Sequence, residues 1–355
     1  MKDNTRIKTK HNYFASSNSY DGFVSYFDNV FSSRDFTKIF VLKGGPGTGK
    51  STLMKRVACY GESQGFYTEA IYCSSDSKSL DGIIIKSDKG SIAIIDGTAP
   101  HERDAIIPGA VDELVWLGEG WRSSELEEQR GRIFDINSKK TANYKKAYEN
   151  LHLSSIFARN IRADIAKYLD FKKIDHSVNM LCRDIYCEGK SKKSIRLISS
   201  FSKEGATKLP TLYDISEKVY TVSGKYGSCE IYLSLLLAAL QKTDMNYTVF
   251  PTALDKNIYD AIYLNDTKTV IMTAESDDAY INTMEYMNKD ALHGEMNNLI
   301  NNTRIKNYFM EKARDCLAKA SEFHFELESI YTPSMDFLLL DEYTDKIIDR
   351  CLSIL

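Results

Sequence analysis

The chain of 355 residues has little proline and glycine, only 6 and 19 residues. This scarcity excludes a collagen-like chain and a flexible low-complexity chain. The longest nearly continuous apolar run, 231–240, is about half of what a membrane-spanning helix needs, and no secretory signal is recognised at the start. The seven cysteines include no Cys-x-x-Cys pair, which predicts reduced thiols, a cytoplasmic location and no zinc site.

What is present is typical of a folded protein with two domains: 43% hydrophobic residues, 27% charged residues and a net charge of −3. The charges are unevenly distributed. Residues 121–200 contain 17 Lys and Arg against 10 Asp and Glu, whereas residues 211–355 contain 13 against 23. This pattern fits either a nucleic-acid surface or the docking of one part of the chain on the other. We favour docking, because no basic cluster is interleaved with the aromatic residues that single-strand binders use.

Four short segments recur in the same order along the chain. Segments 14–22, 40–47, 79–85 and 93–95 resemble 197–205, 220–227, 258–264 and 270–272, at offsets between 177 and 183 residues. Such ordered matches predict an internal duplication.

Each copy is predicted to end in two helices. Apolar and small residues recur at alternating steps of four and three between Ala147 and Tyr168, and again between Phe309 and Ile330. This period of 3.5 residues is typical of a helix that packs along another helix. Shorter apolar helices are expected around 174–185 and 335–352, the second introduced by Thr332-Pro333-Ser334.

The strongest functional signal is the segment 44–51, which matches the phosphate-loop pattern G-x-x-x-x-G-K-S between an apolar strand at 39–42 and a helix that ends near Gly61. Glycines let backbone amides approach phosphate oxygens. Lys50 places a charge against the β and γ phosphates, and the Ser51 hydroxyl is a suitable ligand for Mg²⁺. The predicted nucleotide-binding residues are Gly44, Gly45, Pro46, Gly47, Thr48, Gly49, Lys50, Ser51 and Thr52.

A second acidic strand end is expected beside this loop. Asp96 closes the apolar run 91–96 and is predicted to hold Mg²⁺ together with Ser51; the alternative is a turn-forming Asp before Gly97. His101 and Glu102 follow closely and are predicted, with Lys50 and Asp96, to be catalytic. For His101, the alternative is a local hydrogen-bond partner. The residue after Asp96 is Gly97, where fast ATP hydrolases carry an acid, so slow turnover is expected.

The second copy lacks the residues that the chemistry requires. At an offset of 180, Gly49, Lys50 and Ser51 become Cys229, Glu230 and Ile231, and the counterpart of Asp96 is Thr273. A negative charge beside a polyphosphate costs about 4 kcal/mol per charge pair at 4 Å and moderate dielectric. The second copy is therefore predicted not to bind nucleotide.

Several other residues leave two interpretations open. Asp112 and Glu113 are expected to cap a helix or to face the site, with the cap favoured. A group of arginines fits either a phosphate-clamping lid or a solvated face: Arg122, Arg130 and Arg132. A polar segment shared by both copies is expected to form the fold or, less favoured, to line the base site: Ser16, Ser17 and Asn18.

The sequence resembles a little-characterised bacterial family of duplicated P-loop ATPases that are also described as nucleotide-kinase-like. The resemblance rests on four blocks: 44–51, 73–76 with 79–82, 96–101 and 108–113. It implies ATP binding at Lys50 and Ser51, with Asp96 as the acidic strand end. Members often keep a second phosphate loop, from which Glu230 departs.

Together these observations predict an α/β protein made of two tandem P-loop NTPase-like three-layer α/β/α domains, each followed by a helical hairpin. The first domain is placed at 1–190 with a hairpin at about 122–187, and the second, a pseudo-domain, at 191–355 with a hairpin at about 286–354. The expected function is slow Mg-ATP hydrolysis that drives a conformational switch. The alternatives are a kinase for a nucleotide or another small-molecule acceptor, and a non-catalytic ATP sensor that acts through partners. No membrane or nucleic-acid partner is expected, and the oligomeric state is left open.

Overall fold

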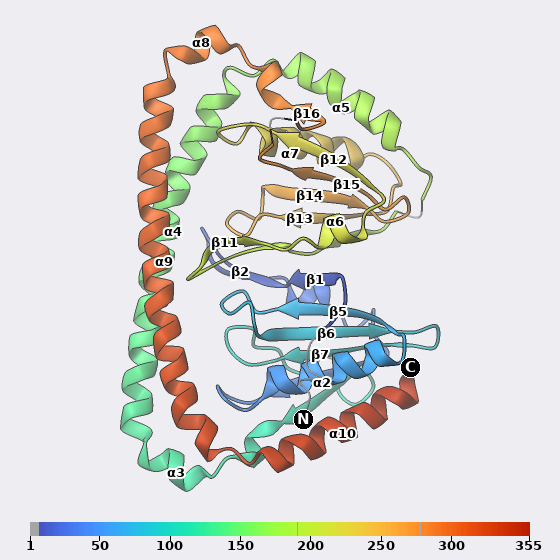
Figure 1. The fold of residues 1–355 in the computed structure, drawn as a ribbon, viewed down its shortest axis with the longest axis vertical. Coiled ribbons are helices and arrows are strands. Elements are labelled where there is room, and N and C mark those ends of the chain that lie inside the picture. The colour runs from blue at the N-terminus through green and yellow to red at the C-terminus, as the bar shows by residue number, and fades with distance from the viewer. Residues whose placement is uncertain (1–6, 190, 277) are drawn as a thin grey trace.

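The computed structural model describes residues 7–189, 191–276 and 278–355. Two six-stranded sheets form two halves of the molecule, and both lie on one side of a pair of long helices (Figure 1). The predicted boundary between domains falls at residue 190, which lies outside the described residues.

The two sheets have the same topology. In each sheet, the strand that precedes the glycine-rich loop pairs in parallel with one neighbour on either side. Beyond one of these neighbours lie two strands joined by antiparallel pairing, and then an edge strand that pairs in parallel with the last of them. The order in the first half is β1 (His11–Phe14), β5 (Tyr67–Tyr72), β6 (Leu80–Lys86), β7 (Ser91–Asp96), β4 (Lys38–Lys43) and β8 (Asp112–Trp116). The order in the second half is β9 (Lys193–Ile195), β13 (Tyr247–Pro251), β14 (Tyr259–Leu264), β15 (Thr269–Thr273), β12 (Lys218–Ser223) and β16 (Ile281–Asn282).

The remaining elements also occur twice in the same sequence order. The first set is β2 (Ser16–Ser19), β3 (Gly22–Ser25), α1 (Phe27–Val30), α2 (Lys50–Ser63), η1 (Leu117–Gly120), α3 (Ser123–Glu128), α4 (Arg130–Ala166) and α5 (Phe171–Ile185). The second set is β10 (Ser199–Ser202), β11 (Gly205–Lys208), α6 (Thr211–Ile215), α7 (Ser228–Leu240), η2 (Thr283–Tyr286), α8 (Lys289–His293), α9 (Met296–Tyr331) and α10 (Phe337–Ile354), with the short η3 (Thr332–Ser334) before α10. The structure is thus repeated, as the sequence matches indicate.

The long helices α4 and α9 pack along each other in opposite directions (Figure 1). Their contact includes Ala147 and Leu151 of α4 with Ala313 and Leu317 of α9, residues that belong to the predicted stripes of period 3.5 or lie beside them. The antiparallel direction follows from two polar contacts: Arg132 near the start of α4 pairs with Glu326 near the end of α9 at 2.9 Å. At the other end, the Ser154 hydroxyl donates to the Lys306 carbonyl at 3.2 Å.

The predicted helical hairpins are not formed, because the short helices are exchanged between the halves. At about 1.5 Å per residue, the 37-residue α4 is roughly 55 Å long, and it carries the chain past its own sheet to the second half (Figure 1). Helix α5 therefore begins beside the second half, where Ile174 and Val178 share a core with Leu233 of α7. In the same way, α10 returns to the first half, where Leu340 and Ile347 share a core with the residues of α2.

Helix α2 covers one face of the first sheet, and α7 covers one face of the second. The opposite faces of the two sheets contribute to one core that both halves share. Ile39 and Val41 of the first sheet belong to one cluster with Val270 and Met272 of the second. In the described residues, the predicted second helical layer is reduced to the short helices α1 and α6, which pack across the junction on β9 and β1. Ser16, Ser17 and Asn18 are buried in β2, where the Asn18 amide donates to the Phe201 carbonyl at 2.8 Å, so this segment forms the junction of the halves.

The length and hydropathy of the described helices give no candidate for a membrane span.

Candidate functional site

The loop 44–51, called here the first loop, connects β4 to α2. Gly47 and Gly49 have φ angles of 72° and 78°, the left-handed region in which residues with a Cβ are strained. Thr48 is buried between them, and its hydroxyl donates to the Gly45 carbonyl at 2.9 Å. Helix α2 begins at Lys50. The loop therefore ends at the first turn of a 14-residue helix, whose backbone N–H groups lack intrahelical partners and attract anions.

Lys50 is folded over the first loop. Its Nζ donates to the Gly44 carbonyl at 2.7 Å and to the Gly45 carbonyl at 2.9 Å. The same atom lies 3.6 Å from Oδ2 of Asp96. The structure thus brings Lys50 and Asp96 together, although they are 46 positions apart in the sequence.

Asp96 combines the two roles between which the sequence leaves a choice. Its Oδ1 accepts a hydrogen bond from the Thr98 backbone N–H at 2.9 Å and another from the Thr98 hydroxyl, which is the turn-forming role. Its Oδ2 faces Lys50. Burial raises the pKa of Asp96, and Lys50 opposes that shift. A further cation at this carboxylate would favour its charged form.

The two oxygen donors that the sequence predicts for a magnesium ion belong to α2 and β7. The Ser51 hydroxyl lies in the first turn of α2 and accepts a hydrogen bond from the Leu80 N–H at 3.0 Å, and the Asp96 carboxylate ends β7. In the described part of the chain, no three His, Cys, Asp or Glu side chains gather as a metal cluster. A magnesium ion would therefore take its other ligands from water and phosphate, as is usual for Mg²⁺ with nucleotides. Thr52 is exposed on the same turn.

His101 is buried and paired with an acid that sequence reasoning did not identify. Its Nε2 lies 3.0 Å from Oδ2 of Asp81 on β6, and its ring stacks on Phe27 with centroids 4.4 Å apart. Its Nδ1 is buried and has no hydrogen-bond partner among the described residues. Two signals point to Asp81: Asp260 holds the same place in the second copy, and Asp81 lies in the block 79–82 that contributes to the family resemblance. Glu102 is exposed.

Burial lowers the pKa of His101, but the carboxylates of Asp81 and, to a smaller extent, Asp96 outweigh burial, and the pKa is raised above its ordinary value. A raised histidine pKa stabilises the fold fully below the unfolded value of about 6.5 and loses this effect as pH rises through the folded pKa. We therefore expect Asp81→Asn to reduce the free energy of unfolding more at pH 5.5 than at pH 8.5, by about 1.5 kcal/mol. Urea unfolding at both pH values measures this difference. In a His101→Phe background the pH dependence of the Asp81→Asn effect should disappear; its persistence there would contradict the assignment.

The glycine that follows Asp96 cannot be replaced by a larger residue without a shift of its surroundings. A Cβ on Gly97 would lie 2.4 Å from Cγ1 of Val41 and 2.9 Å from the Arg103 carbonyl oxygen. The backbone here therefore leaves no room for an acid that would activate water.

Asp112 does not cap a helix; it begins β8 and is buried in an ion pair with Arg103, at 3.3 Å. The cap interpretation was wrong because Asp112 accepts backbone N–H groups of the preceding loop, those of Ile106 and Ile107. Glu113 pairs instead with Lys38 and with Arg350 of α10. Of the three arginines, Arg122 pairs with Glu125 and donates to the Pro333 carbonyl of η3. Arg132 pairs with Glu326, and Arg130 lies over the ring of Phe134.

The junction of α9 and α10 covers the first loop, which the sequence analysis did not anticipate. A Cβ on Gly47 would lie 2.5 Å from Oγ1 of Thr332 in η3, and one on Gly49 would lie 2.4 Å from Cδ2 of Leu340 in α10. The left-handed φ favours glycine at both positions, and at Gly47 the backbone N of Thr332, 3.1 Å from the Cβ position, adds a close approach. The last helices of the chain, which belong to the second copy, complete the surroundings of the first loop.

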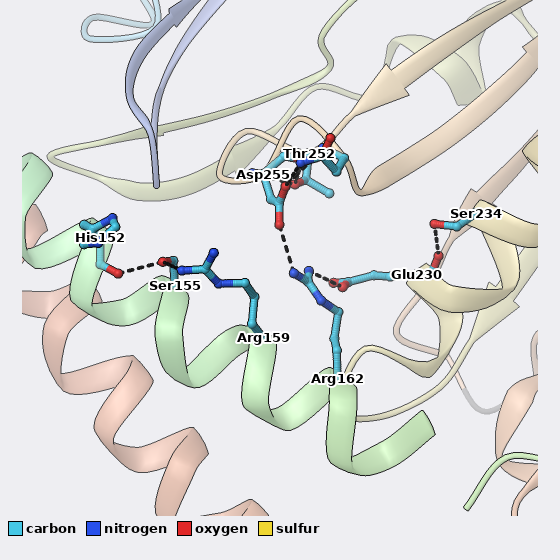
Figure 2. A network of polar contacts seen from close by, with 9 residues as sticks. His152, Ser155, Arg159, Arg162, Glu230, Ser234, Thr252 and Asp255 are labelled. Atoms are coloured by element: carbon cyan, nitrogen blue, oxygen red, sulfur yellow. Dashed lines mark hydrogen bonds and ion pairs between the residues drawn. The ribbon is translucent and has the colours of Figure 1, made fainter. Parts of the chain in front are cut away.

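The counterpart loop in the second half, 224–231, is called here the second loop, and an internal ion-pair network occupies it (Figure 2). Gly227 keeps a left-handed φ, 86°, and α7 begins directly after it, as α2 begins directly after Gly49. Glu230 is the third residue of α7, whereas Lys50 is the first residue of α2. Arg162 of α4 lies against Gly227, where a Cβ would come within 2.7 Å of its Cγ. The Arg162 guanidinium lies 3.3 Å from Oε2 of Glu230 and 2.9 Å from Oδ2 of Asp255.

In this network, each shielded charge has a partner of the opposite sign. Burial raises the pKa of Glu230, and Arg162 opposes that shift. The neighbouring Arg159 points to Ser155, whose hydroxyl accepts from it at 3.0 Å, and takes no part in the ion pairs (Figure 2). Glu230 is thus the anion of the second loop, and a cation from α4 neutralises it.

Comparisons of the chain with protein-family models, curated proteins and solved structures found no match.

Proposed function

We propose that this protein is a P-loop NTPase that binds Mg-ATP at the first loop and hydrolyses it slowly. The observation that carries the proposal is the position of Lys50. Its Nζ lies over the carbonyls of Gly44 and Gly45 and beside Asp96, at the N-terminus of α2. A lysine in this place can exchange backbone carbonyls for phosphate oxygens without a large movement, and loop amides and the helix N-terminus add to the attraction.

In this proposal, Ser51 and Asp96 hold the magnesium ion, which would neutralise phosphate charge when bound. The His101 imidazole, whose Nε2 lies 3.0 Å from Oδ2 of Asp81, would in its charged form add positive charge near the carboxyl end of β7, where Asp96 lies. The pKa of His101 is raised, which favours the charged form, in which the imidazole donates hydrogen bonds from both ring nitrogens. Phosphoryl transfer depends mainly on such positioning and charge.

Slow turnover follows from the crowding at Gly97, since no acid is positioned there to activate water. The same observation favours a second candidate function, transfer of the γ-phosphoryl group to a hydroxyl of a nucleotide or another small molecule, because this reaction needs no dedicated water-activating acid. If the protein binds Mg-ATP and catalyses neither reaction, it is a non-catalytic ATP sensor.

The expected use of the nucleotide is a conformational switch. The first loop touches Thr332 and Leu340, so a change in the loop on binding phosphate would act directly on the junction of α9 and α10. Helix α9 packs along α4, and α4 reaches the second half through Arg162. The second loop, where Glu230 in the first turn of α7 is paired with Arg162, serves as the fixed end of this connection.

Lys50→Ala should reduce ATP-dependent phosphate release by about 100-fold, since it removes the lysine charge placed against the β and γ phosphates, worth about 3 kcal/mol. Phosphate release with Mg-ATP in excess measures the effect. Lys55→Ala is the matched control, because Lys55 lies on the same helix and donates to the Lys78 carbonyl rather than to a carbonyl of the first loop. Undiminished release in Lys50→Ala would refute the proposal.

Screening nucleosides and nucleotides as acceptors separates the two reactions. A phosphorylated product that forms with wild type and not with Lys50→Ala would identify a kinase. Phosphate release without any such product would favour the hydrolase.

A further inference from the structure

We propose that Trp116 and Trp121 form the binding platform for the base of the nucleotide, a planar heteroaromatic ring. The inference rests on the proposed function, because it places the base of the same ligand whose phosphates occupy the first loop. The sequence contains only two tryptophans, and both lie here.

Both rings are positioned by the strand that neighbours the first loop. Trp116 is the last residue of β8 and pairs in register with Lys43, the last residue of β4. Ligands of open α/β sheets bind outside the carboxyl ends of parallel strands such as these. Trp121 follows η1 and lies against the loop itself, since a Cβ on Gly45 would come within 3.1 Å of its Cζ2.

Trp116 is held firmly and yet remains open to solvent. Its ring lies on Gly118, where a Cβ would come within 2.2 Å of its Cζ2, and it meets Trp121 edge-to-face at 5.7 Å. Nevertheless, Trp116 is 49% exposed. A large, fixed and exposed aromatic ring is what base stacking requires, because every base presents a π face.

Trp121 offers one polar group next to this ring. Its Nε1 is buried and has no hydrogen-bond partner within the described residues. Tyr331 of α9 packs on the other side of the indole, with ring centroids 5.7 Å apart. The buried N–H is an available donor for an acceptor on the ligand, since such groups are normally satisfied.

The second half provides an internal comparison. Its short helix η2 follows β16 in the same way as η1 follows β8. The residue before η1 is Trp116, and the residue before η2 is Asn282. The residue after η1 is Trp121, and the residue after η2 is Met287. The half that carries Lys50 and Ser51 therefore has both tryptophans, whereas the half with Glu230 and Ile231 has neither. The aromatic pair accompanies the intact phosphate loop.

The test compares Mg-ATP with inorganic tripolyphosphate, which has the phosphates and no base. Calorimetric titration of the full chain should show that Trp116→Ala weakens Mg-ATP binding by about tenfold and leaves tripolyphosphate binding unchanged. Trp116→Phe should restore most of the lost affinity. Tyr280→Ala is the matched control, since Tyr280 is an exposed aromatic beside β16 of the second half.

The outcomes separate this inference from the function on which it rests. Equal affinity of wild type for both ligands, or an equal effect of Trp116→Ala on both, would overturn the platform and leave the phosphate site standing. A change of oligomeric state in Trp116→Ala without loss of ATP affinity would also overturn it and assign the ring to a protein contact. Failure of wild type to bind either ligand would overturn the function and the inference together. As a direct readout, tryptophan emission of Trp121→Phe should be quenched by Mg-ATP and not by tripolyphosphate.

Discussion

Ile347→Ala should destabilise the first half of the molecule, although Ile347 lies in the last helix of the chain. The side chain is buried in one core with α2 and with strands of the first sheet. Its truncation removes buried methyl groups and leaves a cavity, so we expect the free energy of unfolding to fall by about 3 kcal/mol. Denaturant unfolding followed by tryptophan emission measures this loss, and its signal reports on the first half because both tryptophans belong to it.

Leu338→Ala provides the control for this experiment. Leu338 lies on the same helix but is 75% exposed, so its replacement should change stability by less than about 0.5 kcal/mol. Equal effects of the two substitutions, or a loss for Ile347→Ala seen only in the second half, would contradict the exchange of α5 and α10 between the halves.

Arg162→Ala should also be strongly destabilising, by about 3 kcal/mol. The substitution leaves Glu230 and Asp255 without the cation that lies within 3.3 Å and 2.9 Å of them (Figure 2). All three side chains are largely shielded from solvent, with exposed fractions of 18%, 31% and 17%. Loss of one partner of a shielded ion pair costs more than the pair contributes, since the remaining charge has to be accommodated without compensation. Thermal or urea unfolding followed by circular dichroism measures the effect.

Arg159→Ala is the matched control, because Arg159 lies one turn earlier on α4 and donates only to the Ser155 hydroxyl, at 3.0 Å (Figure 2). Its replacement should cost less than about 1 kcal/mol. Glu230→Ala should cost less than Arg162→Ala, since Arg162 keeps Asp255. If Arg159→Ala were as destabilising as Arg162→Ala, the network would not be what connects α4 to the second loop.

The sequence was sufficient to predict the local elements of the first loop. The apolar run 91–96 and the glycine-rich segment between strand and helix predicted β7, β4 and α2 at nearly their observed bounds. Both long helices were also predicted, because an apolar stripe of period 3.5 depends only on residues close in sequence. The start of α10 was placed too early: Thr332-Pro333-Ser334 forms η3, and the helix is capped by Asp336, which accepts the Leu338 N–H at 2.9 Å.

What the sequence did not predict depends on contacts between distant segments. An apolar stripe indicates that one face of a helix is covered but not which segment covers it. The exchange of α5 and α10 between the halves is therefore visible only in the structure, where α4 carries the chain to the second half. Asp81 and His101 are 20 positions apart, and Arg162 and Glu230 are 68 apart. Neither pair has a local signature, because long-range ion pairs are set by tertiary packing.

The central claim is that one loop of this repeated fold holds Mg-ATP and the other does not. Isothermal titration of the full chain with Mg-ATP tests it most directly. We predict one site per chain in wild type, one in Glu230→Ala and none in Lys50→Ala. Two sites per chain, or a site that persists in Lys50→Ala, would contradict it.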